Sequence, residues 1–205
     1  GRREGQKMDD QKALLTRIAE ALERLAPAPL RADLSAADAF HWNPRGYALE
    51  PVLNPVRTPL ELLLEAERQK EALVSNTRRF AAGAGANNAL LWGARGTGKS
   101  ALIKAVHAKV AAEAPGLKLV EAAPDALDRI GVLIDALRAQ DAPVILFLDD
   151  LSFAGGEAAL KVLKPALDGG LQRSGRLIVY ATSNRRHLVE RDARENNPGD
   201  LMWAD

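Results

Sequence analysis

Short apolar runs alternate along this chain with longer stretches in which apolar residues recur at helical spacing. Four runs predict buried strands, namely Ala89–Trp92, Leu117–Val120, Val144–Leu148 and Leu177–Tyr180. Stretches with helical spacing follow three of them, over 101–110, from 125 to 137 and over 157–167. Strands that alternate with helices predict a parallel α/β sheet with right-handed crossovers.

The first 80 residues have a different pattern. Asp9 or Asp10 can cap a first helix that runs to about Leu25. From there to about Thr58 the chain is rich in proline and turn residues, which predicts an irregular segment packed on the domain surface. Pro59 then begins a helix expected over Leu60–Phe80. We therefore expect an N-terminal helix and irregular segment over 1–58, a core over 59–190 and the start of a C-terminal region over 191–205.

Residues 93–100 read G-A-R-G-T-G-K-S, which matches the phosphate-loop pattern G-x-x-x-x-G-K-[ST] between a predicted strand and a predicted helix. Glycine lets backbone N–H groups approach a phosphate chain closely. Lys99 is placed to reach the β- and γ-phosphates, and Ser100 to bind Mg²⁺. An ordinary glycine-rich turn explains one or two glycines, but not these two residues. The predicted phosphate contacts are Gly93, Ala94, Arg95, Gly96, Thr97, Gly98, Lys99, Ser100 and Ala101.

Polar residues also follow two other predicted strands. Asp149 and Asp150 end one, and Asn184 ends another. Ligands of parallel sheets bind beyond the carboxyl ends of the strands, so we expect these residues to meet the loop. Asp149 is the candidate Mg²⁺ carboxylate together with Ser100. The alternative for Asp149 is a helix N-cap.

Asp150 is a candidate catalytic residue that accepts a proton from, or orients, an attacking water, the alternative being a cap of the next helix. Asn184 is a candidate for a hydrogen bond to the γ-phosphate or the water, the alternative being a plain turn. Arg185 and Arg186 can meet phosphate in this subunit or a neighbour, or form a solvated basic turn. The three histidines, His41, His107 and His187, lack metal-ligand spacing.

Composition narrows the class of protein. An apolar content of 47% over 205 residues is enough for a core, and a net charge of +1 gives no indication of a nucleic-acid partner. The sequence has no cysteine, so disulfides and thiolate metal sites are excluded, and a reducing cytoplasm is expected. No apolar run reaches the length of a membrane span. Because the sequence begins Gly1-Arg2-Arg3 without Met, it is expected to start inside a longer protein or to carry added residues.

The order of loop, Asp-ending strand and Asn-ending strand resembles AAA+ ATPases. More closely, five segments look like one bacterial AAA+ family of unknown function over roughly residues 40–190. They are Glu67–Leu73, Asn76–Phe80, Asn87–Gly93, Asp149–Phe153 and Tyr180–Leu188.

The resemblance implies a three-layer P-loop NTPase fold that binds ATP or ADP with Mg²⁺. It implies the usual roles for Lys99, Ser100 and Asp149, and a sensor 1 role for Asn184. The chain departs from the pattern at Asp150, where most AAA+ ATPases have Glu. It also stops at Asp205 without the helical lid, its second sensor arginine or the trans-acting arginine region.

Three functions are consistent with the sequence. The favoured one is an Mg²⁺-dependent ATPase that drives conformational change in a protein partner or homo-oligomer. A nucleotide-gated binding module with little turnover is the second, in keeping with the shorter Asp150. A small-molecule kinase is the third, although no acceptor site is recognisable. Val52 to Val56 are a candidate segment for contacts to the base.

Overall fold

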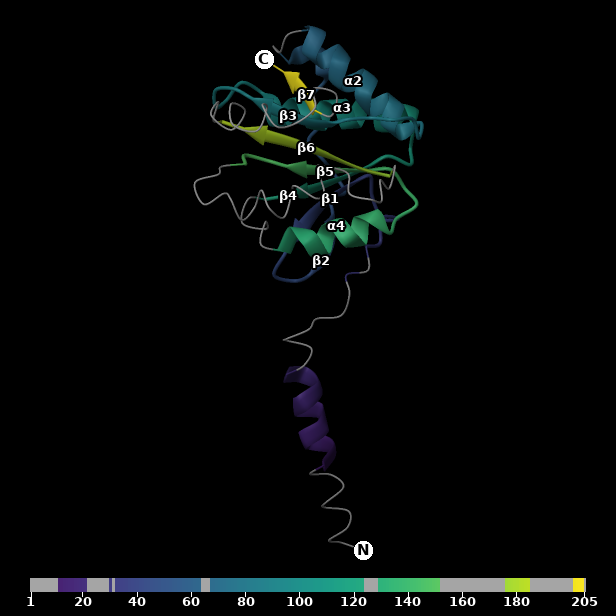
Figure 1. Cartoon of the computed structure of the whole chain (residues 1–205), viewed down its shortest axis with the longest axis vertical. Helices are drawn as coiled ribbons and strands as arrows, with labels where there is room; N and C mark the ends of the chain where they lie inside the picture. The colour runs from purple at the N-terminus through teal and green to yellow at the C-terminus, as the bar shows by residue number, and fades with distance from the viewer. Residues whose placement is uncertain are drawn as a thin grey trace, which may run out of the picture. The chain divides into compact units, whose positions relative to one another are not determined.

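The computed structural model describes residues 11–21, 30, 32–63, 67–123, 129–151, 176–184 and the strand 201–204, and the chain divides into two compact units, 1–30 and 31–205 (Figure 1). In the first unit, residues 11–21 form a helix. This confirms the expected first helix over that range, and its apolar residues Leu14, Leu15 and Ile18 are exposed.

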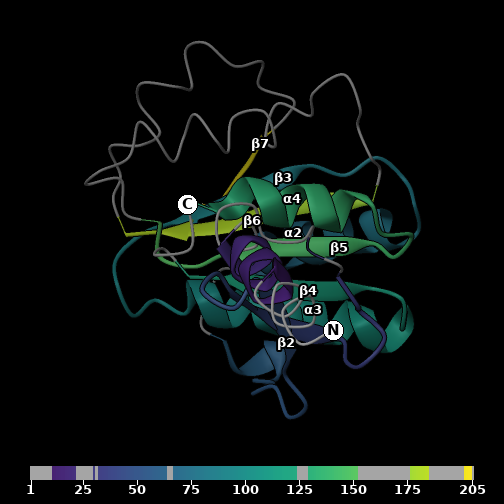
Figure 2. The same ribbon diagram turned by 90° about the horizontal axis from the view of Figure 1, so that it is seen from below.

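The second unit is built on one sheet. The described strands are β1 (Ala39–Asn43), β2 (Ala48–Pro51), β3 (Asn88–Trp92), β4 (Lys118–Ala122), β5 (Val144–Leu148), β6 (Leu177–Ser183) and β7 (Leu201–Ala204). Among them the spatial order is β2-β1-β4-β5-β6-β3-β7, and only the β1–β2 pair is antiparallel. Figure 2 shows β3, β6, β5 and β4 succeeding one another across the sheet. The predicted parallel sheet is confirmed.

The described helices of this unit are the 3₁₀ turn η1 (Leu60–Leu62), α2 (Glu67–Ala81), α3 (Lys99–Glu113) and α4 (Ile130–Arg138). α3 leads from β3 to β4, and α4 leads from β4 back to β5, so the two crossovers run in opposite directions along the sheet. Right-handed crossovers then place α3 and α4 on opposite faces, which gives three layers. None of the described helices is long and apolar enough to span a membrane.

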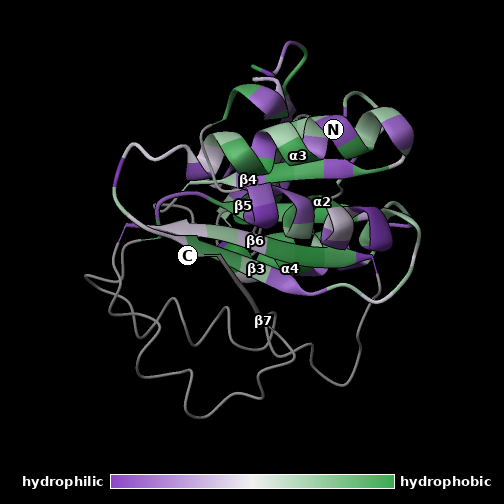
Figure 3. Cartoon of the chain, turned by 90° about the horizontal axis from the view of Figure 1, so that it is seen from above, coloured by the Kyte–Doolittle hydropathy of each residue, from purple (hydrophilic) through white to green (hydrophobic). Residues whose placement is uncertain are grey.

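One hydrophobic core lies between the sheet and the α2–α3 pair. Alternate residues of the central strands, such as Ile145 and Phe147 in β5, pack there with Leu73 of α2 and Val106 of α3. All five residues of β5 are buried, as expected for a strand covered on both faces. Figure 3 shows these strands in the green of apolar residues.

Three expectations need correction. The supposedly irregular segment contains the β1–β2 hairpin, because β1 pairs with β4 and buries Phe40 and Trp42, which are 1% and 0% exposed. The expected continuous helix over Leu60–Phe80 is interrupted, since Leu63 is extended (φ −83°, ψ 131°) and α2 begins only at Glu67. β7 was not expected as a strand, and it pairs with β3. Two expectations lie outside the described residues. They are the helix over 157–167 and the first part, 125–128, of the helix expected from 125 to 137.

Candidate functional site

The loop after β3 has a backbone conformation that favours glycine. Gly96 and Gly98 have φ values of 83° and 95°, the left-handed region that L side chains rarely adopt. A Cβ at either position would meet no atom within 4 Å, so backbone conformation and not lack of space selects glycine. Trp92 ends β3 half-buried just before the loop, and α3 begins at Lys99 just after it. The predicted strand–loop–helix arrangement is present.

Lys99 lies folded along this loop. Its side chain is buried, and Nζ donates hydrogen bonds to the carbonyl oxygens of Ala94 (2.7 Å) and Gly93 (3.1 Å). Thr97 Oγ1, 3.4 Å from the same Nζ, donates to the Ala94 oxygen at 3.0 Å. The lysine ammonium and the loop backbone therefore form one compact group at the N-terminus of α3, where the helix dipole favours an anion.

Ser100 and Asp149 are brought together, as predicted. Ser100 Oγ donates to Asp149 Oδ1 at 2.5 Å, across the gap between α3 and the end of β5. A hydroxyl and a carboxylate are hard oxygen ligands of the kind that Mg²⁺ prefers. Among the described residues no group of three or more acidic or histidine side chains could hold a metal alone. The pair thus fits an ion that takes only one or two protein ligands and completes its shell with phosphate oxygens and water.

Asp150 and Asn184 also meet. Asp150 has a left-handed backbone, φ 50°, and its carboxylate Oδ1 accepts a hydrogen bond from Asn184 Nδ2. The strand register explains the meeting, because Leu148 lies opposite Ala181 and Trp92 lies opposite Ser183. The ends of β5, β6 and β3 are therefore level, and the loop, both acids and Asn184 occupy one edge of the sheet.

Thr182 is a residue of this site that the sequence reasoning missed. Its hydroxyl donates to Asp149 Oδ1 at 2.7 Å and accepts the backbone N–H of Asp150 at 2.8 Å. A signal was present in the sequence, since side chains two apart on a strand share a face, and Thr182 is two residues before Asn184. The sequence analysis placed Asn184 at the end of this strand but did not follow the alternation back from it to Thr182.

Other candidates stand apart from this cluster or outside the described residues. Arg185, Arg186 and His187 lie outside them. His41 is exposed, whereas His107 is buried with Nε2 3.4 Å from the Leu117 oxygen. Burial lowers the pKa of His107 to about 4, which leaves its ring neutral at pH 7. Neither belongs to a metal-binding group among the described residues.

The segment suggested for base contacts is described in part. Val52 packs against the core and donates its N–H to the Ala39 oxygen at 2.8 Å, while Val56 is 85% exposed. Whether these residues contact a base stays a prediction.

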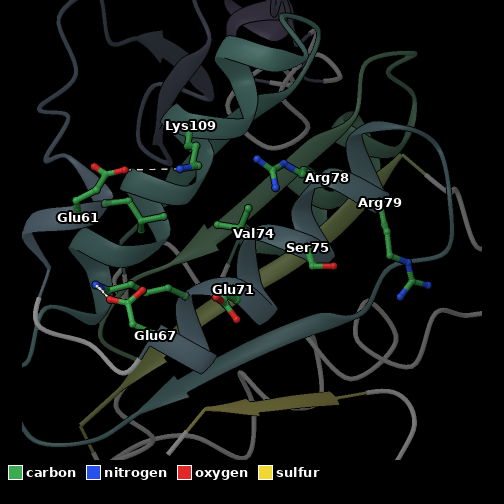
Figure 4. A pocket seen from close by; sticks show the side chains of 10 residues that line it. Glu61, Glu67, Glu71, Val74, Ser75, Arg78, Arg79 and Lys109 are labelled. Carbon is green, nitrogen blue, oxygen red and sulfur yellow. Dashed lines mark hydrogen bonds and ion pairs between the residues drawn. The ribbon is translucent and has the colours of Figure 1, made fainter.

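A separate hollow of about 460 Å³ lies between η1, α2 and the far half of α3 (Figure 4). Two ion pairs lie within its lining, Lys109 with Glu61 at 3.6 Å and Lys70 with Glu67 at 2.9 Å. None of the residues that line it belongs to the loop or to the acidic pair. The chemistry of the loop edge is therefore not located in this hollow.

The fold of this chain is similar to that of several proteins of known structure. The chain is similar in fold to C. elegans PCH-2, with 16% identity and a TM-score of 0.51 over 72% of this chain and 44% of that chain. It is similar to the Aeropyrum pernix ORC1 protein in complex with DNA, with 16% identity and a TM-score of 0.53 over 68% of this chain and 44% of that chain. It is also similar to the Aeropyrum pernix ORC2 protein in ADPNP–ADP complexes, with 18% identity and a TM-score of 0.50 over 75% of this chain and 50% of that chain. These similarities support an AAA+ P-loop fold, and this chain spans half or less of each of those proteins.

The family can be stated more closely. Residues 35–204 match the family described as protein of unknown function (DUF815), and the chain belongs to that family. No match was found among curated proteins. The expected membership of a family of unknown function is therefore confirmed, and the similarity to the solved structures agrees with the expected fold.

Proposed function

We propose that this chain binds ATP with Mg²⁺ and hydrolyses it to drive a conformational change in a protein partner or in an oligomer of the chain. The observation that supports this most is the single chain of hydrogen bonds at the sheet edge. It runs from Ser100 through Asp149 and Thr182 to Asp150 and Asn184, beside the loop that carries Lys99. Phosphate binding, metal binding and water activation need these groups side by side.

Each residue then has a distinct task. The N–H groups of the loop and the Lys99 ammonium bind the phosphates, for which Lys99 exchanges its contacts to the Gly93 and Ala94 oxygens. Ser100 and Asp149 would hold Mg²⁺, which would neutralise negative charge on the phosphates. Asp150 accepts the proton of the attacking water or orients it, and Asn184 fixes the Asp150 carboxylate or contacts the γ-phosphate.

A second candidate function is a nucleotide-gated binding module with little turnover. Two features of Asp150 favour it: its side chain is shorter than that of Glu, and its Oδ1 already accepts a hydrogen bond from Asn184. Both features hold the carboxylate back from a water at the γ-phosphate. The two candidates share the binding step and differ in hydrolysis alone.

The binding step is tested by calorimetry with ATP and Mg²⁺ on the wild type, Lys99→Ala and Lys109→Ala. Charge-assisted hydrogen bonds contribute about 1.5–3 kcal/mol, so Lys99→Ala should weaken ATP binding by roughly 10- to 150-fold. Lys109 is a matched control because it is on the same helix but pairs with Glu61. Unchanged ATP affinity in Lys99→Ala would contradict the site.

Hydrolysis is tested by phosphate release from the wild type and Asp150→Asn. The proposal expects turnover in the wild type and its loss in Asp150→Asn, with ATP affinity retained. A wild type that binds ATP but releases no phosphate supports the gated module instead. Phosphate that appears on a small acceptor would indicate a kinase.

A further inference from the structure

The hydroxyl of Thr182 lies between the two acids of the candidate site. It is 2.7 Å from Asp149 Oδ1 and 2.8 Å from the backbone nitrogen of Asp150. The residue is 2% exposed, so water does not compete for these contacts. One buried hydroxyl thus contacts both the candidate metal ligand and the candidate catalytic residue.

The direction of each hydrogen bond is fixed by the atoms involved. A backbone N–H can only donate, so the Thr182 oxygen accepts from Asp150. The single hydroxyl proton of Thr182 is then given to the Asp149 carboxylate. Thr182 therefore orients one oxygen of Asp149, as outer contacts of metal ligands commonly do.

The same hydroxyl supports an uncommon backbone conformation. Asp150 has φ 50°, and a non-glycine residue keeps such a conformation only where its surroundings hold it. Two contacts do so here, the Thr182 hydroxyl on its N–H and Asn184 on its carboxylate. Without the Thr182 oxygen, the N–H of Asp150 loses its acceptor, and the direction of the Asp150 side chain is less constrained.

We propose that Thr182 is a positioning residue that couples the metal-binding carboxylate to the orientation of Asp150. This inference rests on the proposed function. Asp149 Oδ1 accepts from both Ser100 and Thr182. When Ser100 turns its oxygen to the metal, Thr182 is the donor that remains on Asp149, so metal affinity and hydrolysis both depend on it.

The experiment compares Thr182→Val, Thr182→Ser and Thr77→Val with the wild type. Valine has nearly the same shape as threonine but lacks the hydroxyl, and serine keeps the hydroxyl. Thr77→Val makes the same substitution at another buried threonine, whose hydroxyl contacts Leu73 and Tyr180 and neither acid. Thermal unfolding verifies that each variant is folded, and Thr182→Ala replaces Thr182→Val if valine prevents folding.

Three quantities are measured: ATP affinity without Mg²⁺, the Mg²⁺ concentration that gives half-maximal ATP binding, and kcat. Thr182→Val should raise the half-maximal Mg²⁺ concentration or lower kcat by about 10- to 100-fold, the usual effect of losing an outer contact of a metal ligand. ATP affinity without Mg²⁺ should stay within about 2-fold, because the loop is untouched. Thr182→Ser should restore both quantities, and Thr77→Val should leave them unchanged.

Wild-type Mg²⁺ dependence and kcat in Thr182→Val would overturn the inference. So would an equal loss in Thr77→Val, which would indicate general destabilisation. These results differ from a failure of the proposed function, in which the wild type itself does not bind ATP and the inference fails with it. If the wild type binds ATP without turnover, the Mg²⁺ dependence of binding still decides the role of Thr182.

Discussion

The hydroxyl of Tyr180 should stabilise the fold by an amount that the structure allows to be worked out. Tyr180 is fully buried in β6 and meets two side chains of α2. Asn76 Nδ2 donates to its oxygen at 3.0 Å. Thr77 Oγ1, 2.8 Å away, gives its own proton to the Leu73 oxygen, so Tyr180 is the donor in the Tyr180–Thr77 bond. One hydroxyl therefore makes two buried bonds between helix and sheet.

Tyr180→Phe removes both bonds and little else. At about 0.5–1.5 kcal/mol for each bond, the expected loss of unfolding free energy is about 1–3 kcal/mol. The value should lie in the upper half of this range, because one N–H of Asn76, itself 5% exposed, is left without an acceptor while the other keeps the Asn87 oxygen.

Urea unfolding followed by circular dichroism at 222 nm measures this loss. Tyr47→Phe is the matched control, since Tyr47 is the other tyrosine and its hydroxyl makes no hydrogen bond to the described residues. A change below about 0.5 kcal/mol in Tyr180→Phe, the range of ordinary surface substitutions, would refute the reasoning. Thr77→Val in the Tyr180→Phe background should cost less than in the wild type, because the two changes share one bond.

The pH dependence gives a second readout. Burial raises the pKa of the Tyr180 phenol, against the smaller opposite effect of the Thr77 and Asn76 hydrogen bonds. The folded state then keeps a proton that the unfolded state loses above about pH 10. Stability from this group is complete below pH 10 and falls as the pH rises beyond it. Tyr180→Phe should not show this part of the loss of stability at alkaline pH.

Two further predictions concern α3 and the loop. Because burial lowers the pKa of His107 to about 4 from 6.5, the unfolded state binds more protons between these values, and about 3 kcal/mol of stability should be lost as the pH falls through this window. His107→Gln should flatten that dependence in urea unfolding at pH 4 to 7, and an unchanged slope would contradict the assignment. Gly98→Ala should cost about 1–2 kcal/mol, since φ is 95° and no neighbour obstructs a Cβ. Gly83→Ala, at φ 74°, is the control that should lose similar stability while only Gly98→Ala weakens ATP binding in calorimetry.

The central sheet was predictable because its signals are local. Val144–Leu148 is a continuous apolar run, which predicts β5. The loop motif is expected between a strand and a helix, which predicts β3 before it and α3 after it. The meeting of Asp149 with Ser100 then follows from the rule that parallel strands end at one edge.

The remaining features depend on partners distant in the sequence. β1 and β2 lie in a stretch of prolines and turn residues, and β1 becomes a strand because β4 provides its ladder and a buried place for Trp42. The interruption at Leu63 is hidden because helical spacing continues through it. Thr182 carries no motif of its own, and its contact with Asp149 depends on the register that brings β6 level with the end of β5.

Trp92 gives the site an optical property. Trp92 is half-buried and directly precedes Gly93, the first residue of the loop. The sequence has two other tryptophans, Trp42 and Trp203. Trp42 is fully buried in β1, toward the edge of the sheet away from β3, and Trp203 is in β7. If Lys99 leaves the Gly93 and Ala94 oxygens for a phosphate, as proposed, we expect the polarity to change near Trp92 and not near Trp42. The intrinsic emission of the unlabelled protein should therefore shift when the loop is filled.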